Sequence, residues 1–407
     1  MALFTRRKFT LSTLTAAATL PLIGCGKKTA AANTFKIGIL LPTSGFEAAL
    51  GQSCKRGADV ALSVLKNIYN VDFDIVFADT ESNANVGRNK AEKLITEGAH
   101  VLIGAFDSGV TASIAQVCEQ RSIPFVINIA AAPQITEQGY KFTFRNFPTG
   151  SMLIKNGLSL MKDLFKMQGI APKTAAFVHV NDTYGEAMRK GIEQLFPTLD
   201  MPFQIVETVS YDPKTQDLAT EIGKVKASGA ELIMPATRLE DAVLLVKEVF
   251  KQKLNIMGII NPGSPGMYEK DFFTQLGDKS DHWISNTAWY NPKSSITQEV
   301  IKAMEKIAPT DYLETNSAYT FEAIHIAVDA YKRANSFDPK NLRDALIATH
   351  IEEHVTLGGP IQFDEKGQSK NVTSASMQNR DGKPRVILPL DVSEIKPIFP
   401  IPSYKAA

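Results

Sequence analysis

Residues 35–42 read FKIGILLP, an apolar run of the length of one β-strand that ends at a proline. A strand that is apolar on both sides is typical of a parallel sheet covered by helices on both faces. Residues 48–67 then have helical spacing, and a second short apolar run, FDIVFA, follows at 73–78. This part of the chain therefore predicts strand, helix and parallel strand, the repeating unit of an α/β fold.

The same alternation continues along most of the chain and forms two successive sets. The first set continues with helices at 84–97 and 109–121 and strands at 100–104 and 125–129. The second set has strands at 174–180, 203–209, 231–235 and 255–260, with helices at 184–196, 217–228 and 240–252 between them. Further helices are predicted at 297–307, 317–334 and 339–349, before a more strand-like tail at 360–390. The pattern predicts an α/β protein with two doubly wound parallel-sheet lobes.

Length and composition agree with a globular protein of two domains. The 407 residues suffice for two cores, and 44% hydrophobic and 21% charged residues are ordinary for a folded chain. The formal charge is +1, and the first 24 residues contribute three basic side chains and no acid, which leaves −2 for the remainder. A nearly neutral chain has no bulk electrostatic attraction to nucleic acid, so no nucleic-acid partner is expected.

The first 24 residues have the features of an export signal. A basic start, TRRKF at 5–9, precedes the apolar run LSTLTAAATLPLI at 11–23, which is too short to span a bilayer comfortably. The paired arginines resemble a twin-arginine signal, and an ordinary secretory signal with a basic start is the alternative. Export predicts a protein of the periplasm or the cell surface.

The four residues at the end of this signal, Leu-Ile-Gly-Cys at 22–25, resemble a bacterial lipoprotein box. The resemblance implies cleavage after residue 24 and lipidation of Cys25, which would anchor the chain to the membrane. A plain cleavage site with a chance cysteine is the alternative. Residues 25–34 are expected to be a flexible tether.

Cys54 and Cys118 are the two other cysteines. Export permits a disulfide between them. Both lie in helical stretches that the predicted fold places on opposite faces of a sheet, so two buried free thiols are expected instead.

The predicted topology also indicates where a ligand would bind. In open α/β sheets, ligands bind outside the carboxyl ends of the strands. The loops at these ends are 43–51, 105–111 and 130–133 in the first set, and 181–185, 236–241 and 261–266 in the second. If the two sheets face each other, these six loops line one cleft.

Several side chains in these loops suit a small ligand. Asp107 and Ser108 open a helix, whose first N–H groups favour a carboxylate, although helix capping alone would also explain them. Arg238 directly follows a strand, where it either pairs with a ligand carboxylate or is a solvated or lobe-to-lobe arginine. Tyr184 either covers an apolar part of the ligand or has a packing role, and Phe46 and Phe106 are candidates of the same kind.

Motifs of catalysis and of cofactor binding are missing. The sequence has no G-x-G-x-x-G after a strand, no P-loop, no H-E-x-x-H and no G-x-S-x-G. His350 and His354 have the spacing of metal ligands on a helix, but the helix is expected to end near them and no third ligand accompanies them. We therefore expect no enzyme, no catalytic residue, no cofactor and no metal.

Five segments together resemble the branched-chain amino acid-binding family, the type I periplasmic binding proteins of ABC transporters. They are KIGILLPTSG (36–45), LIGAFDSGVTASIA (102–115), IPFVINIAAAP (123–133), NDTYGE (181–186) and GGPIQFDEKGQ (358–368). The resemblance implies two lobes joined by three crossings, which close on a small molecule and present it to a membrane permease driven by ATPase subunits. It places one lobe at 35–149 plus 287–357 and the other at 150–286 plus 358–407.

The pocket positions of the family carry over unevenly. Ser108 matches the serine that holds a ligand carboxylate, and Tyr184 matches a pocket tyrosine. Ala131 replaces a threonine, and Arg238 replaces a tyrosine. The acid that binds an amino group falls near Ile260 or Asn261, so that carboxylate is lost. The predicted ligand-binding residues are Phe46, Phe106, Asp107, Ser108, Ile129, Ala131, Tyr184, Arg238 and Asn261.

These departures bear on the ligand, because a desolvated ammonium needs an acid or carbonyls. They favour a small organic acid or amide over a hydrophobic amino acid. A receptor of the same fold that signals rather than transports is the alternative function.

Overall fold

The computed structural model describes residues 34–402. The predicted export signal, Cys25 and the predicted tether up to residue 33 lie outside the described residues. Within 34–402, no helix is both long and apolar enough to cross a membrane.

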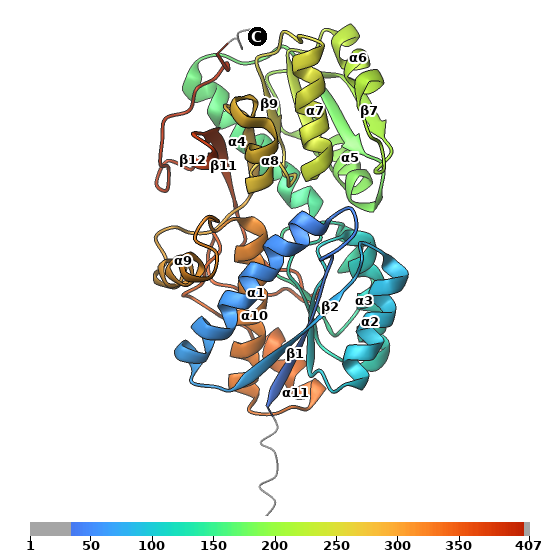
Figure 1. The fold of residues 1–407 in the computed structure, drawn as a ribbon, viewed down its shortest axis with the longest axis vertical. Coiled ribbons are helices and arrows are strands. Elements are labelled where there is room, and N and C mark those ends of the chain that lie inside the picture. Colours follow the sequence, from blue (N-terminus) through green and yellow to red (C-terminus); the bar gives the residue numbers. More distant parts are fainter. Residues whose placement is uncertain (1–33, 403–407) are drawn as a thin grey trace, which may run out of the picture. The chain divides into compact units, whose positions relative to one another are not determined.

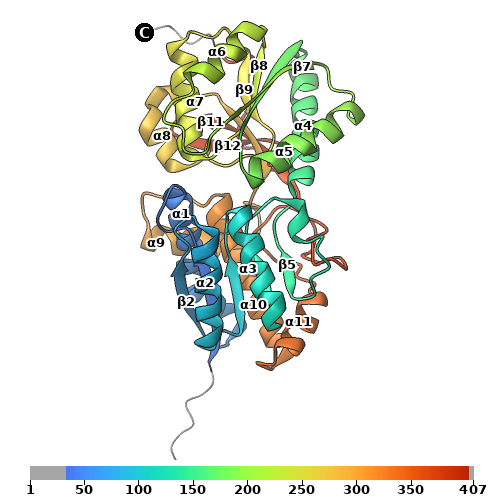
Figure 2. The same cartoon turned by 90° about the vertical axis from the view of Figure 1, so that its right-hand side faces the viewer.

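The first sheet, with the helices packed on it, is called lobe 1. Its strands are β1 (Phe35–Leu41), β2 (Phe73–Asp79), β3 (Val101–Gly104), β4 (Phe125–Ile127) and β5 (Thr143–Arg145), parallel throughout and in the order β2-β1-β3-β4-β5. One face carries α1 (Ala48–Tyr69) and α10 (Thr315–Ala334), and the other carries α2 (Ala84–Thr96) and α3 (Ser108–Arg121) (Figures 1 and 2). Helix α9 (Ser295–Ile307) packs on α1, and α11 (Pro339–Ile347) packs on α10.

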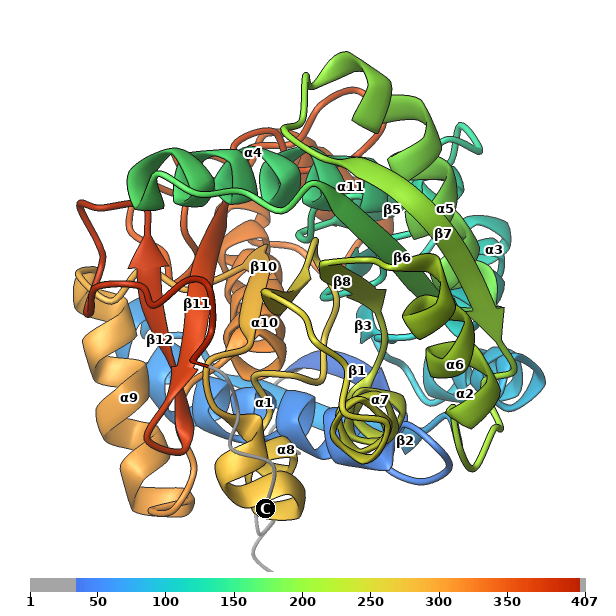
Figure 3. The ribbon, with the colours of Figure 1, turned by 90° about the horizontal axis from the view of Figure 1, so that it is seen from above.

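The second sheet, with its helices, is called lobe 2. Its strands are β6 (Thr174–Val180), β7 (Gln204–Tyr211), β8 (Leu232–Ala236), β9 (Gly258–Asn261), β10 (Ile284–Ala288), β11 (Ser374–Arg380) and β12 (Lys383–Leu388). Their order is β12-β11-β10-β9-β8-β6-β7. Strand β11 pairs in antiparallel fashion with both β10 and β12, and the other pairs are parallel. Helices α4 (Gly150–Gln168) and α5 (Thr183–Leu195) lie on one side, and α6 (Ala219–Ser228), α7 (Leu239–Lys251) and α8 (Lys270–Leu276) on the other (Figure 3).

The predicted fold class, with two doubly wound and mainly parallel sheets, is confirmed. Strands β5 and β10 were not predicted, because neither forms an apolar run. The first is the tripeptide TFR, and the second, ISNTA, has a polar centre that is buried all the same. Their contribution comes from backbone pairing with neighbouring strands, which a hydrophobic pattern does not report.

The chain passes between the lobes three times. Two passages follow β5 and β10, and the third leads into β11. The segment 361–369, expected in lobe 2, lies along β5: Arg145 N donates to the carbonyl of Gly367 (2.7 Å), and Ser369 N donates to that of Arg145 (3.0 Å). Gly367 fits there with φ of 74°, and a Cβ atom would meet the carbonyl oxygen of Thr143 at 2.2 Å. The third passage therefore begins after Ser369, later than the expected boundary at 358.

Cys54 and Cys118 are buried free thiols on α1 and α3, as expected from their opposite sheet faces. Burial raises the pKa of both thiols, so both stay protonated at neutral pH.

A fully buried arginine in β5 fixes the loop that follows β4. Arg145 Nη1 donates to the carbonyls of Ala130 (2.9 Å) and Ala132 (2.7 Å), and its Nη2 donates to the Thr136 hydroxyl (2.7 Å). Its Nε donates to Gln368 Oε1 (2.7 Å). Burial lowers the pKa of Arg145 to about 9. The arginine therefore joins three segments of lobe 1 through hydrogen bonds to neutral acceptors.

Replacing Arg145 is expected to destabilise the protein strongly. Arg145→Ala leaves several buried acceptors without a donor, each worth about 1–3 kcal/mol, so we expect the free energy of unfolding in urea to fall by several kcal/mol. The matched control is Arg121→Ala, which removes an exposed arginine paired with Glu92 and should cost about 1 kcal/mol or less. Equal stability of the two variants would contradict the role given to Arg145.

Candidate ligand-binding site

A pocket with an empty volume of about 430 Å³, part of it open to solvent, lies between the carboxyl ends of the two sheets. Its lining comes from both lobes. Lobe 1 supplies Phe106, Asp107, Ser108, Ile129, Ala130, Ala131, Phe147, Thr315 and Asn316. Lobe 2 supplies Leu153, Tyr184, Arg238, Gly263, Pro265, Tyr268 and Thr287. The mainly apolar lining with a few polar groups is typical of sites for small molecules.

Two loops of lobe 1 enter the pocket with a backbone that non-glycine residues seldom adopt. Phe106 has φ of 73° and Ala130 has φ of 117°, and both residues line the pocket. Such conformations cost on the order of 1–3 kcal/mol each and persist only where the surrounding contacts enforce them. For Ala130, the hydrogen bond from Arg145 to its carbonyl is one such contact.

The start of α3 supplies a polar end to the pocket. Asp107 caps the helix, with its Oδ1 accepting from Val110 N (2.9 Å), and its carbonyl accepts from Thr111 N (2.9 Å). The first N–H groups of a helix lack acceptors within the helix, and in α3 these belong to Ser108 and Gly109. The Ser108 hydroxyl, 2% exposed, accepts a long hydrogen bond from Ala132 N (3.4 Å). This end can therefore donate to a carboxylate or carbonyl oxygen.

The backbone of Arg238 is fixed between β8 and α7. Arg238 N donates to Asp241 Oδ1 (2.6 Å), an acid in the first turn of α7. Gly266 passes directly over the Arg238 carbonyl with φ of 99°, and a Cβ atom there would lie 2.4 Å from that oxygen. The glycine is required at this crossing, because any other residue would displace the arginine.

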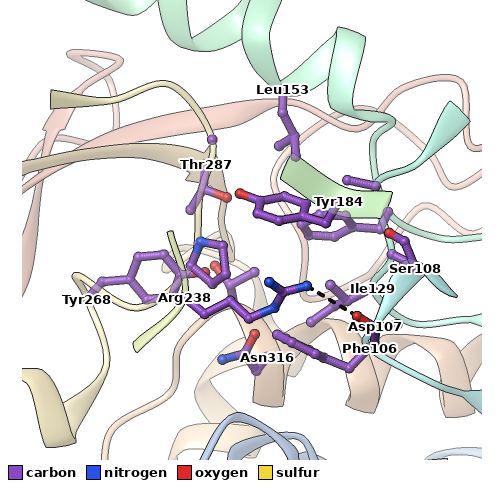
Figure 4. A pocket seen from close by; sticks show the side chains of 16 residues that line it. Phe106, Asp107, Ser108, Ile129, Leu153, Tyr184, Arg238, Tyr268, Thr287 and Asn316 are labelled. Carbon is purple, nitrogen blue, oxygen red and sulfur yellow. Dashed lines mark hydrogen bonds and ion pairs between the residues drawn. The ribbon is translucent and has the colours of Figure 1, made fainter. Parts of the chain in front are cut away.

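The side chain of Arg238 joins the two lobes. Its Nε lies 2.6 Å from Glu47 Oε1, its Nη2 3.1 Å from Asp107 Oδ2, and its Nη1 2.6 Å from Asp182 Oδ2. The guanidinium also lies 5.1 Å from the centre of the Tyr184 ring. Glu47 and Asp107 belong to lobe 1, and the other residues to lobe 2. Figure 4 shows the guanidinium reaching across the pocket towards Asp107. We call Arg238, Glu47, Asp107 and Asp182 the Arg238 cluster.

The cluster places several carboxyl groups around one buried cation. Burial opposes the charge of Arg238, but Glu47, Asp182 and Asp107 together hold its pKa above the ordinary value. Burial raises the pKa of Glu47 to about 8, against the opposing effect of Arg238. Burial also raises the pKa of Asp241. The arginine is thus charged, and three carboxyl groups contact it.

Tyr184 presents a hydroxyl group without a hydrogen bond to any described residue. The residue is 7% exposed, and burial raises the pKa of its hydroxyl, which therefore stays protonated. In Figure 4 the hydroxyl end of the ring points across the pocket towards Thr287. A buried donor without a partner costs free energy, so this hydroxyl is available to a ligand.

The structure brings most of the predicted site residues together. Phe106, Asp107, Ser108, Ile129, Ala131, Tyr184 and Arg238 all line the pocket. Phe46 and Asn261 are not in the lining. Phe46 is 51% exposed, and Asn261 is fully buried, where its amide donates to Ser285 Oγ (2.8 Å) and accepts from the backbone of the following loop.

Sequence reasoning missed several lining residues, because it considered only loops at the ends of recognised strands. Thr287 comes from β10, which the hydrophobic pattern did not reveal, and Phe147 follows β5 for the same reason. Thr315 and Asn316 open α10, where the Asn316 amide donates to Glu269 of lobe 2. Helix α10 begins two residues before the predicted start at 317, so these two residues fell outside both the predicted helix and the predicted loops.

The described residues contain no group of histidine, cysteine and acidic side chains suited to a metal ion.

Comparison with known proteins places the chain in a family. The family model described as periplasmic binding protein matches residues 34–383. A curated relative, Leu/Ile/Val-binding protein homolog 7 of Brucella suis biovar 1 (strain 1330), is 24% identical over 385 residues, covering 89% of this chain and 93% of the relative.

Two solved structures share the fold. A leucine binding protein from Thermotoga maritima has a TM-score of 0.76 at 19% identity and covers 87% of this chain and 97% of its own. A solute binding protein of an ABC transporter from R. palustris, in complex with benzoate, has a TM-score of 0.75 at 19% identity and covers 89% and 98%. Because the family match spans most of the chain, the protein belongs to the periplasmic binding protein family, whose members bind substrates and are not enzymes.

Proposed function

We propose that this protein is the exported substrate-binding component of an ABC transporter, which binds one small molecule between its lobes and delivers it to a membrane permease. The observation that carries the proposal is the pocket itself, which both lobes line at the carboxyl ends of their parallel strands. A ligand in this position contacts both lobes and so favours their closed arrangement, which a permease can recognise.

The proposed ligand is a small, largely apolar organic acid or amide, with a hydrophobic amino acid as the neighbouring class. Its carboxylate or carbonyl oxygen would accept from Ser108 and from the first N–H groups of α3. Its apolar part would lie against Phe147 and Leu153. The acid that would hold an amino group is replaced by Asn261, which is buried and already hydrogen-bonded. The two solved relatives, one a leucine binding protein and one in complex with benzoate, support testing both classes.

The proposed location is the periplasm or the cell surface, with the chain anchored to the membrane through lipidated Cys25. The basic and apolar leader with its Leu-Ile-Gly-Cys ending supports this part of the proposal. The proposed partners are the permease and its ATPase subunits.

A thermal-shift screen tests the ligand class. The panel holds benzoate and other small acids, their amides, and leucine-like amino acids. A ligand at about 1,000 times its Kd adds roughly 4 kcal/mol to the folded state, so a true ligand raises Tm by several degrees. Stabilisation by acids or amides supports the proposal, and stabilisation by amino acids alone contradicts the preference for a ligand without an amino group. Silence across the whole panel would contradict the proposed ligand classes.

Ser108→Ala tests the polar end of the pocket. A hydrogen bond to a charged group is worth about 1.5–3 kcal/mol, so affinity for a carboxylate ligand should fall roughly tenfold or more in calorimetric titration. Ser113→Ala in the same helix is the matched control, because that hydroxyl bonds to the carbonyls of Ala84 and Val110 instead. Equal affinities in the two variants would remove Ser108 from the site.

Tyr184→Phe separates ligand binding from stability. Since the hydroxyl has no protein partner, its removal should leave the Tm of the ligand-free protein unchanged or slightly higher. Affinity for a ligand that accepts a hydrogen bond from it should fall several-fold. A lower Tm with unchanged affinity would mean that the hydroxyl serves the fold instead.

A further inference from the structure

We propose that Arg238 holds the two lobes together in the closed form and does not recognise the charge of the ligand. We also propose that Glu47 binds one proton when the lobes close. The inference rests on the proposed function, because it concerns how the same pocket closes. The Arg238 cluster should therefore affect the affinity for every ligand, whatever the charge of that ligand.

Each nitrogen atom of the Arg238 guanidinium already contacts a carboxyl group of the protein. The three groups belong to different residues, at 2.6 Å for Glu47, 2.6 Å for Asp182 and 3.1 Å for Asp107. A ligand carboxylate could use only the second N–H of Nη1 or of Nη2. It would add a fourth acid to the three carboxyl groups that already surround this one cation, and a buried acid without a cation of its own is costly.

Contacts within lobe 2 already fix the position of the Arg238 side chain. Within lobe 2, Asp182 pairs with it and the Tyr184 ring lies against it, so its position does not depend on lobe 1. Asp182 is fixed in turn, because its Oδ1 caps α5 by accepting from Gly185 N (2.8 Å). Lobe 2 therefore presents a prearranged cation to the other lobe.

Lobe 1 places two acidic side chains, Asp107 and Glu47, against this cation. Asp107 caps α3 with Oδ1, so its Oδ2 is directed to Arg238. Glu47 precedes the first turn of α1 and is only 1% exposed. The ion pair with Asp107 and the contact with the Glu47 carboxyl group cross from lobe to lobe. Opening the lobes breaks both while leaving the pair with Asp182 intact.

Closure also changes the protonation of Glu47, because it buries this carboxyl group among charged side chains. The charged groups that face Glu47 are Arg238 from α7, Asp107 from α3 and Asp182 from α5, and Asp241 also faces the guanidinium. Burial, opposed by Arg238 and assisted by the two aspartates, raises the pKa of Glu47 from 4.5 to about 8. Opening exposes this carboxyl and returns its pKa towards the ordinary value. Between pH 4.5 and about pH 8, the closed form thus binds more protons than the open form.

Closure of the lobes therefore depends on pH through Glu47. Closure is strongest where Glu47 is protonated in the closed form, and it weakens as pH rises through about 8. Between pH 6.5 and pH 9 the equilibrium constant for closure should fall roughly tenfold or more.

Arg238→Ala tests the closure. In small-angle X-ray scattering of the ligand-free protein at pH 6.5, we expect a larger radius of gyration than for the wild type. The control is Arg189→Ala, which removes an arginine of the same lobe whose partners, Glu186 and Glu193, lie on its own helix. This control should keep the wild-type radius. An unchanged radius for Arg238→Ala would overturn the proposal, and this result does not depend on whether any ligand has been found.

The charge of the ligand is tested with benzoate, benzamide and leucine as probes. Arg238→Ala should weaken every probe that binds by the same factor, of tenfold or more. Loss confined to benzoate would overturn the proposal and make Arg238 a ligand contact. If none of the probes binds the wild type, the proposed ligand classes fail, while the scattering result still decides the role of Arg238.

Glu47→Gln tests the proton and does not depend on the folding of Arg238→Ala. Glutamine has the shape of the protonated glutamate, so this variant should stay compact at both pH 6.5 and pH 9, while the wild type expands at pH 9. Expansion of Glu47→Gln in parallel with the wild type would overturn the proton uptake.

Discussion

A guanidinium group buried between two lobes is the constraint on which the closed arrangement depends. Burial of an unpaired charge is prohibitively costly, so Arg238 can lie 7% exposed only because carboxyl groups of both lobes surround it. Each surrounding group is fixed by its place at a helix start: Glu47 at α1, Asp107 at α3 and Asp182 at α5, with Arg238 itself at α7. Acids are favourable at helix N-termini, which carry a partial positive charge. The helices that form the fold therefore also place the charges that join its halves.

This convergence follows from the parallel sheets. In a strand-helix unit of this kind, every helix of the crossover begins near the carboxyl end of the strand before it. Two such sheets that face each other at those ends bring the starts of α3, α5 and α7 to one pocket, which Ser108, Tyr184 and Arg238 line (Figure 4). The start of α1 places Glu47 against Arg238. Apolar side chains such as Phe147 and Leu153 complete the lining. The pocket thus combines an apolar surface for the ligand with a separate set of ion pairs for the lobes.

Much of this could be predicted from the sequence, because buried parallel strands are continuous apolar runs and their carboxyl ends locate the site. Asp107, Ser108, Tyr184 and Arg238 were found in this way. The partners of Arg238 could not be found, since an ion pair between residues 47 and 238 leaves no local pattern. Strand β10 was missed because its buried polar residues are held by backbone pairing, and with it Thr287 was missed. The path of residues 361–369 along β5 was also beyond prediction, since it depends on hydrogen bonds across more than 200 positions of sequence.

The central claim is that one small molecule binds between the lobes and contacts both. Hydrogen–deuterium exchange of the protein, with and without a saturating acid, amide or amino acid from the screen, tests it most directly. The account predicts slower exchange in loops of both lobes, at 105–111 and 130–136 on one side and at 181–185 and 236–241 on the other. Protection restricted to one lobe, or protection that leaves these four loops unchanged, would contradict binding between the lobes.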